Sequence, residues 1–136
     1  MSRIALDLNF DMVSRSDVNE LYVSGTYEYP GLMAIVDEVK PKARVNLLTG
    51  HDSPALGADD WTNQSDHYAF YEAGIPFLYF GVEDHPDYHQ PTDDFDKIRP
   101  EFFVHSADTL VMAAIIADKM LDTLDYTPSP DVQPSQ

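Results

Sequence analysis

The stretch IPFLYFGV, residues 75–82, is apolar on both faces and so predicts a central strand that is buried on both sides. The next stretch, GVEDHPDYHQPTDDFDKI (81–98), places two histidines, five aspartates and a glutamate directly after that strand. A segment so rich in nitrogen and oxygen donors is either an acidic surface loop or part of a metal site. The rest of the sequence has to distinguish these two interpretations.

Three further strands are predicted upstream of this central one. Residues 4–12 alternate apolar and polar side chains with a period of two, and ELYVSGT (20–26) follows a segment rich in turn-forming residues. We expect these two strands to pair as a hairpin. ARVNLLTG (43–50) predicts the remaining strand, and the long loop at 51–63 that follows it has a length often associated with function.

Helices are predicted between the strands and at the end of the chain. Pro30 begins one helix and Pro41 ends it, and SDHYAFYEAG (65–74) predicts a short helix with Ser65 as its N-cap and Gly74 just after its end. The clearest helix runs over residues 100–124. Its predicted buried stripe consists of Phe103, Ala107, Leu110, Ala114, Ala117 and Leu121.

The order of these elements predicts the α/β class, with a mixed β-sheet flanked by helices. At 136 residues the chain is long enough for one core and too short for two ordinary domains. We assign residues 1–125 to the domain. Residues 126–136, with three prolines and little to bury, are predicted to be a disordered tail rich in proline and serine.

Composition excludes several classes of function. The net charge is −16, with 8 Lys and Arg against 24 Asp and Glu, so a nucleic acid would be repelled. The absence of cysteine excludes disulfides and thiolate ligands, which leaves His, Asp and Glu as the candidate metal ligands. No stretch has the ~20 consecutive apolar residues of a membrane span, so none is expected.

Three motifs occur in order along the chain: NFDM (9–12), SDHYAFYEAGIPFLYFG (65–81) and DYHQPTDDFDKI (87–98). Together they resemble the C-terminal half of the co-catalytic zinc aminopeptidases, metallopeptidase family twenty-eight, whose relatives include glutamate carboxypeptidases and glutaminyl cyclases. The resemblance implies part of a zinc-exopeptidase (phosphorylase/hydrolase-like) fold, a peptide substrate and two zinc ions in the complete enzyme. It also implies a periplasmic or secreted location, although no targeting signal is recognised in the sequence itself.

The resemblance assigns roles to individual residues. It implies that Asp11 is a ligand of one zinc, that His89 is a ligand of the other, and that the Tyr88 hydroxyl hydrogen-bonds the oxyanion. Asp66 and Asp93 are implied to orient the ligands, and His67 is a weaker candidate for the same role. Without the resemblance, an aspartate at a strand end is usually a solvated turn residue. His51, His85 and His105 have no motif support.

One departure from the family decides what we expect of this chain. The family's other ligands and its general base precede the NFDM strand, but here only ten residues precede Asp11, and none of them is His or Glu. A catalytic zinc normally takes three protein ligands. We therefore expect a zinc-dependent aminopeptidase domain without its N-terminal half, inactive alone, that binds zinc weakly or not at all.

Alternative functions and partners follow from the same departure. A non-catalytic binding module on this fold and a glutaminyl cyclase-like acyl transferase are the alternatives to a peptidase. Because a half sheet exposes an edge and an apolar face, we expect the chain to form a homo-oligomer or to associate with a missing N-terminal half.

Overall fold

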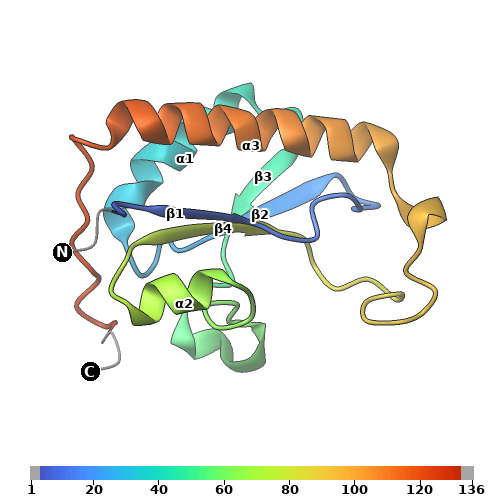
Figure 1. The fold of residues 1–136 in the computed structure, drawn as a ribbon, viewed down its shortest axis with the longest axis horizontal. Helices are drawn as coiled ribbons and strands as arrows, with labels where there is room; N and C mark the ends of the chain where they lie inside the picture. Colours follow the sequence, from blue (N-terminus) through green and yellow to red (C-terminus); the bar gives the residue numbers. More distant parts are fainter. Residues whose placement is uncertain (1–3, 133–136) are drawn as a thin grey trace.

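The computed structural model describes residues 4–132, which form a four-stranded sheet between two layers of helices (Figure 1). Helices α1 and α3 cover one face of the sheet, and α2 and the loop at 51–63 lie on the other face. The mixed sheet flanked by helices confirms the predicted α/β class. The strands are β1 (Asp7–Phe10), β2 (Glu20–Ser24), β3 (Asn46–Thr49) and β4 (Phe77–Gly81), in the spatial order β1-β4-β2-β3.

Strand β4 lies inside the sheet, as its two-sided apolar pattern predicts, and all five of its residues are buried. It pairs in parallel with β1 and antiparallel with β2, whereas β2 pairs in parallel with β3. The predicted hairpin of the first two strands is therefore wrong. The fully apolar β4 gains most from the central position, so it lies between two strands that are consecutive in sequence.

The helices α1 (Met33–Val39), α2 (His67–Glu72) and α3 (Pro100–Met120) connect or follow the strands. Short 3-10 helices at Pro30–Leu32 and Lys40–Lys42 flank α1, and two others lie in the loops at Pro54–Asp59 and Phe95–Lys97. The predicted N-cap of α2 is wrong, because the capping residue is Asp66 and its side chain makes no capping hydrogen bond. Ser65 uses its hydroxyl elsewhere.

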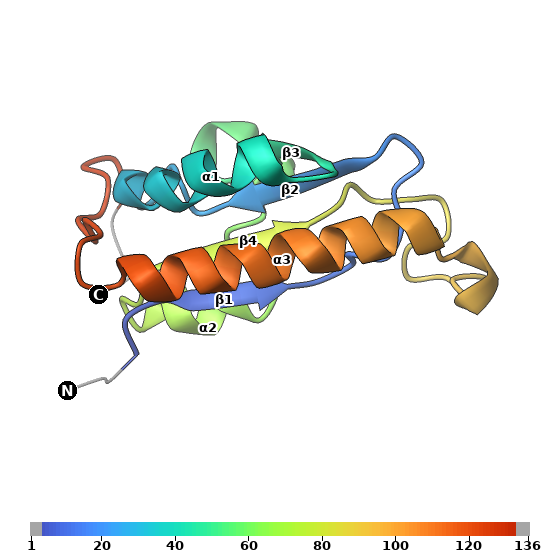
Figure 2. The same cartoon turned by 90° about the horizontal axis from the view of Figure 1, so that it is seen from above.

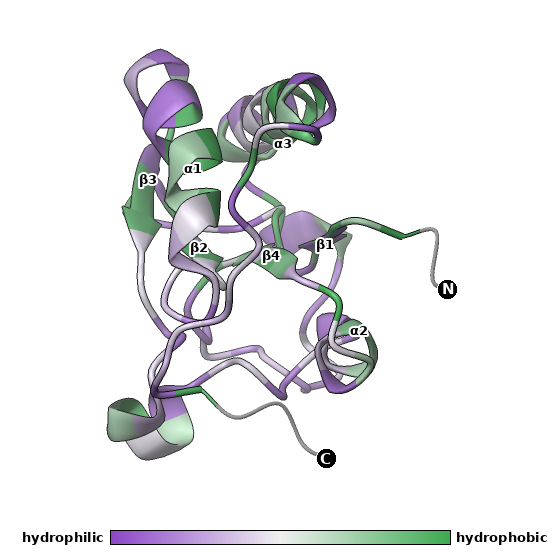
Figure 3. Ribbon diagram, turned by 90° about the vertical axis from the view of Figure 1, so that its left-hand side faces the viewer, coloured by the Kyte–Doolittle hydropathy of each residue, from purple (hydrophilic) through white to green (hydrophobic). Residues whose placement is uncertain are grey.

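The core lies between the sheet and the α1 and α3 layer. Figure 2 shows α3 over β1 and β4 and α1 over β2 and β3, and Figure 3 shows hydrophobic residues in both of these helices and in β4. The largest fully buried apolar side chains come from β2, β3, β4 and the segment around α1: Leu21, Val23, Tyr29, Leu32, Ile35, Val36, Leu47, Phe77, Leu78 and Phe80.

The buried face of α3 is rotated by about one residue from the predicted stripe. Phe103 is 43% exposed and Phe102 is buried in its place. The helix has apolar residues nearly all round, so its hydropathy pattern does not specify which side packs on the sheet. The buried residues of α3 are Phe102, Ser106, Thr109, Leu110, Ala113 and Ala117.

Helix α3 is long and apolar enough to cross a membrane by length and composition alone. A helix that covers the core of a soluble protein passes the same test, and α3 packs against α1. The absence of a membrane span therefore stays a prediction.

Residues 126–132 make specific contacts with the domain, and the predicted disorder of the tail stays a prediction. The Tyr126 hydroxyl donates to the carbonyl oxygen of Leu121 at 2.7 Å, and the Ser129 amide donates to the carbonyl oxygen of Glu28 at 2.7 Å. Val132 is buried. Residues 133–136, the remainder of that tail, lie outside the described residues.

The topology brings two loops to the same end of the sheet. Because β1 and β4 are parallel neighbours, their carboxyl ends lie side by side, and there Asp11 follows β1 and residues 82–99 follow β4. Crevices at the carboxyl ends of strands are the usual sites of α/β sheets. Figure 1 shows these two loops together, opposite the edge where the chain termini lie.

Candidate metal centre

Asp11, Tyr88 and His89 line one open cavity of about 430 Å³, although Asp11 is far from the other two in sequence. Asp93 also lines it, together with Met12, Gln64 and Gln90. The side chains of Tyr88 and His89 stack with ring centroids 3.8 Å apart. The structure thus brings together four of the six residues predicted for the site.

The backbone is strained at this cavity. Met12 (φ +58°) and His89 (φ +54°) both adopt the left-handed conformation, which non-glycine residues rarely use. Strained residues persist only where the surrounding structure holds them, and they gather at functional sites. Met12 directly follows Asp11, so both candidate ligands belong to backbone held in an unusual shape.

A chain of hydrogen bonds connects Asp11 to the protein interior. The Ser65 hydroxyl donates to Asp11 Oδ2 at 2.9 Å, and Asn9 Nδ2 donates to the same hydroxyl oxygen at 3.4 Å. Asn9 Nδ2 also lies 3.5 Å from Nδ1 of His67. These contacts leave Asp11 Oδ1 without a hydrogen bond among the described residues and turn one carboxylate oxygen towards Ser65.

His67 is the buried end of this chain. Its ring is 0% exposed, it stacks against Phe77 with centroids 4.7 Å apart, and its Nε2 lies 3.0 Å from the carbonyl oxygen of Trp61. Since a carbonyl only accepts, Nε2 carries the proton and Nδ1 accepts from Asn9. Burial lowers the pKa of His67, mainly because the charged ring would lose its hydration, so the neutral tautomer is favoured.

The SDH motif therefore contacts Asp11 through Ser65, which the sequence interpretation did not select. Asp66 is exposed and makes no described hydrogen bond to Asp11. Serine is a common N-cap residue, and that more frequent role concealed this one. Ser65 lies beside β1, the strand that ends just before the candidate ligand Asp11, and this position is the signal that could have pointed to its role.

We predict that Ser65→Ala frees the Asp11 side chain to exchange between rotamers, whereas Asp66→Ala leaves it fixed. A hydrogen bond to a carboxylate contributes about 1 kcal/mol, enough to hold one rotamer in excess. Three-bond couplings to the Asp11 β-protons measure these populations by NMR. Averaged couplings in the Asp66 variant alone would contradict the assignment.

Asp93 and His85 lie beside the cavity in a charged network. Arg15 Nη1 lies 3.9 Å from Asp93 Oδ1, and His85 Nε2 lies 3.9 Å from Asp93 Oδ2. The described contacts of Asp93 are therefore with Arg15 and His85, and none joins its carboxylate to the His89 ring. Its predicted role in orienting His89 stays a prediction.

His51 and Trp61 pack together on the α2 side of the sheet and do not line the cavity of the candidate ligands. Their rings stack at 3.7 Å, Trp61 contacts Tyr79 edge to face, and His51 Nε2 pairs with Glu83 Oε1 at 2.9 Å. This cluster fixes the loop at 51–63 against the sheet. It accounts for Trp61 without a substrate pocket.

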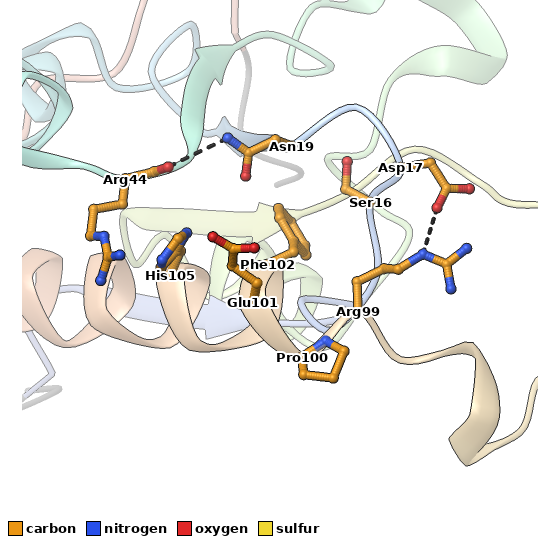
Figure 4. A pocket seen from close by; sticks show the side chains of 9 residues that line it. All are labelled: Ser16, Asp17, Asn19, Arg44, Arg99, Pro100, Glu101, Phe102 and His105. Carbon is orange, nitrogen blue, oxygen red and sulfur yellow. Dashed lines mark hydrogen bonds and ion pairs between the residues drawn. The ribbon is translucent and has the colours of Figure 1, made fainter.

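Another cavity, of about 520 Å³, shares no residue with the candidate metal centre. It lies between the start of α3 and the loops before β2 and β3, and Figure 4 shows its lining. Arg99 pairs with Asp17 at 2.7 Å on one side of the view, and Arg44 lies on the other side. Because the two guanidinium groups do not converge, this cavity does not form an evident anion site.

The described residues do not complete a zinc site by themselves. Among residues 4–132, no group of three or more His, Asp or Glu side chains is arranged to hold a metal ion. Asp11 and His89 bring one carboxylate and one imidazole to the cavity, whereas a catalytic zinc takes three protein ligands. No catalytic step through zinc follows from these residues alone.

Comparisons with known proteins agree with the geometry. Two structures of BSAP, a zinc aminopeptidase from Bacillus subtilis, are similar to this chain at 25% sequence identity, with TM-scores of 0.61 and 0.60. Each match covers 96% of this chain, which spans only 30% of the length of that enzyme. No curated protein sequence matches. Residues 1–114 match the model of Peptidase family M28, and the chain therefore belongs to that family.

Proposed function

We propose that this chain is the C-terminal part of a zinc-dependent aminopeptidase domain that removes N-terminal residues from peptides. The observation that carries the proposal is the cavity shared by Asp11, Tyr88 and His89, at the edge where α/β sheets hold their sites. The family match and the likeness to a zinc aminopeptidase support it.

In the assembled enzyme, Asp11 and His89 each contribute one ligand to a different zinc, and polypeptide other than the described residues contributes the rest. A pair of bound zinc ions would supply an activated water and polarise the scissile carbonyl. Within this chain, Ser65 keeps Asp11 oriented, and Tyr88 offers its hydroxyl at the cavity as a donor to the oxyanion. The ligand count and the 30% coverage of the relative support this division.

We predict that the isolated chain does not hydrolyse a leucine anilide in the presence of added zinc, because two ligands neither hold zinc tightly nor activate water. The measurement is release of the anilide product, with and without a chelator. Turnover that is lost both on chelation and in His89→Ala would overturn the predicted inactivity.

The same protein tests the ligand assignment independently of activity. Titration with Co²⁺, followed by NMR, should weakly and selectively broaden the signals of Asp11, Tyr88 and His89. His89→Gln should remove the broadening, and His105→Gln, which changes a histidine on α3 outside this cavity, should not. Broadening centred elsewhere would contradict the assignment of the cavity as the metal centre.

We further propose that the chain associates through surfaces that the described structure leaves open. Strands β1 and β3 are at the two edges of the sheet, and α3 exposes Val104, Val111 and Ile115 on one side. Exposed strand edges and apolar surface favour contact with another chain. These surfaces fit either a second copy or the remainder of a peptidase domain.

The association is predicted to depend on salt. The net charge of −16 opposes close approach, but salt screens it beyond about 8 Å at physiological ionic strength, whereas apolar contact acts at short range. Light scattering should therefore show dimers or larger species at high salt and a shift towards monomer at low salt. A monomer at high salt and high concentration would refute the predicted self-association.

A further inference from the structure

Arg15 joins the two segments that carry the candidate metal ligands. It follows Asp11 by four residues, in the loop after β1, and its guanidinium reaches across to the loop after β4. Arg15 Nη1 donates to Asp87 Oδ2 at 2.6 Å and lies 3.3 Å from Nδ1 of His85. Asp87 precedes His89 by two residues, so the contact is close to the ligand in sequence.

The ion pair between Arg15 and Asp87 is largely shielded from water. The two side chains are 11% and 14% exposed, respectively. Ion pairs at the surface contribute little, whereas removal of one partner from a shielded pair leaves a charge without compensation. The short distance and low exposure of the Arg15–Asp87 pair make it a shielded pair, so removal of Arg15 is expected to be costly.

The charge of the loop explains why it needs a cation. Residues 83–96 carry six carboxylates, from Glu83, Asp84, Asp87, Asp93, Asp94 and Asp96. Arg15 contacts Asp87 at 2.6 Å and lies 3.9 Å from Asp93, so it reaches acidic residues on both sides of His89. The other nearby cation is Lys97, whose Nζ is 3.8 Å from Asp87 and which is itself part of the loop. Arg15 thus ties the part of this loop around His89 to the segment after β1, whereas Arg99 ties the end of the loop to the same segment through Asp17, at 2.7 Å.

The backbone near the candidate ligands also needs contacts from outside the loop to keep its position. Met12 and His89 are in the left-handed conformation, and the loop around His89 is otherwise closed by short local bonds, such as Tyr88 N to His85 O at 2.8 Å and Gln90 N to Asp87 O at 2.9 Å. Local bonds fix the shape of the loop but not its position on the sheet. At the end of the loop, the Arg99 amide donates to the carbonyl oxygen of Ser14 at 3.0 Å, whereas the contacts of Arg15 fix the part around His89.

We propose that Arg15 is a positioning residue, which holds the Tyr88–His89 segment against the end of β1 so that Asp11 and His89 face one cavity. The metal role of Asp11 and His89 rests on the proposed function above. The contacts of Arg15 with the loop after β4, here called the clamp, are a property of this chain. In Arg15→Met the carboxylates lose the cation that contacts them from the segment after β1, Lys97 of the loop itself remains near Asp87, and the loop moves away from β1. Arg15→Lys keeps the charge but loses the planar guanidinium, so it restores the position only in part.

Spin labels test this without metal or substrate. Because the chain has no cysteine, labels attach only at introduced ones, here Ala69→Cys on α2 and Gln90→Cys in the loop. Electron–electron distance measurements should give a wider and longer distribution in Arg15→Met and an intermediate one in Arg15→Lys. Arg44→Met, which makes the same change of charge at an exposed arginine, should leave the distribution unchanged.

A second pair of labels separates a local clamp from a general loss of structure. Asp37→Cys on α1 and Asp118→Cys on α3 report the packing of the core layer, and their distance should be the same in all variants. Hydrogen exchange at the amides of Tyr88 and Gln90 should become about tenfold faster in Arg15→Met, the effect of losing a charged hydrogen bond. An unchanged Ala69–Gln90 distance, or equal widening of both label pairs, overturns the proposal. If the clamp is confirmed while Co²⁺ broadens no cavity signal, the proposed function fails and the clamp stands.

Discussion

We expect Glu28→Gln to raise the free energy of unfolding at pH 8 by about 3 kcal/mol. Glu28 is 2% exposed, at the junction between β2 and α1. Its Oε1 accepts a hydrogen bond from the Thr62 hydroxyl at 2.9 Å, and its Oε2 is buried with no partner among the described groups. A carboxylate with one uncompensated oxygen is costly to keep charged in the interior.

The pKa of Glu28 gives the pH range of this effect. Burial raises the pKa from its ordinary value of 4.5 to about 7, against the opposing effect of the hydrogen bond from Thr62, and the carboxylates of Asp52 and Asp60 raise it further. Below pH 4.5 the group is protonated in both the folded and the unfolded chain and costs nothing. Between pH 4.5 and 7 only the unfolded chain loses the proton readily, so stability falls as the pH rises, and the full cost is present above pH 7.

The measurement is urea unfolding of wild type and Glu28→Gln between pH 4 and 8, followed by the fluorescence of Trp61, the single tryptophan. The difference between the two proteins should be small at pH 4 and should grow to its maximum above pH 7. The matched control is Glu38→Gln, which changes an exposed glutamate of α1 that pairs with Lys42 at the surface, and its effect should be below about 1 kcal/mol at every pH. A difference that does not vary with pH would show that the buried carboxylate is already compensated.

Gly25→Ala should destabilise the chain by about 3–5 kcal/mol, or prevent folding. Gly25 joins β2 to the segment before α1 with φ +110°, a conformation that side-chain-bearing residues rarely adopt. A Cβ atom at this position would collide with the backbone carbonyl oxygen of Phe77, the first residue of β4. Because the obstacle is backbone in the central strand, it cannot move aside as a flexible side chain could.

The same substitution also threatens a buried hydrogen-bond cluster. Asp52 is 5% exposed, and its Oδ2 accepts from the amides of Gly25 and Tyr27, each at 2.9 Å, and from the Thr26 hydroxyl at 3.2 Å. A shift of Gly25 away from Phe77 would loosen these contacts. Gly74→Ala is the control, since Gly74 also has positive φ (+72°) but nothing lies within 4 Å of its Cβ position, so it carries only the conformational cost of about 1–2 kcal/mol.

Equal losses in the two alanine variants, measured by urea unfolding, would contradict the role of the close approach to Phe77. A much larger loss at Gly25 is the expected result of its φ of +110° together with the steric contact with β4.

Local patterns in the sequence predict most of the helices and strands and the class of fold. The two-sided apolar pattern of residues 75–82 predicts a buried central strand, and β4 is that strand. An uninterrupted run of apolar residues in a strand places apolar side chains on both faces, so both faces have to be buried. The motifs containing Asp11 and His89 predict the family, and the family match over residues 1–114 confirms it. These signals are local, so each can be recognised from neighbouring residues alone.

Which elements are neighbours depends on how the whole chain packs, and no local pattern predicts it. The predicted hairpin of β1 and β2 is wrong because strand pairing depends on burial summed over the whole sheet, and that sum favours placing β4 between them. The buried face of α3 likewise depends on the surface against which the helix packs, since an apolar pattern nearly all round allows more than one face. Phe102 rather than Phe103 points inward for that reason.

The site shows the same division at the level of single residues. Sequence motifs select Asp11, Tyr88 and His89, but the contacts of Ser65 with Asp11 and of Arg15 with Asp87 join residues more than fifty positions apart. Such contacts leave no periodicity in the sequence, because serine and arginine at these positions are equally typical of a helix start and a solvated loop. The contact of Arg15 with Asp87 arises when the parallel pairing of β1 and β4 brings the loops after these strands together, and the contact of Ser65 with Asp11 arises when α2 packs on β1 and β4.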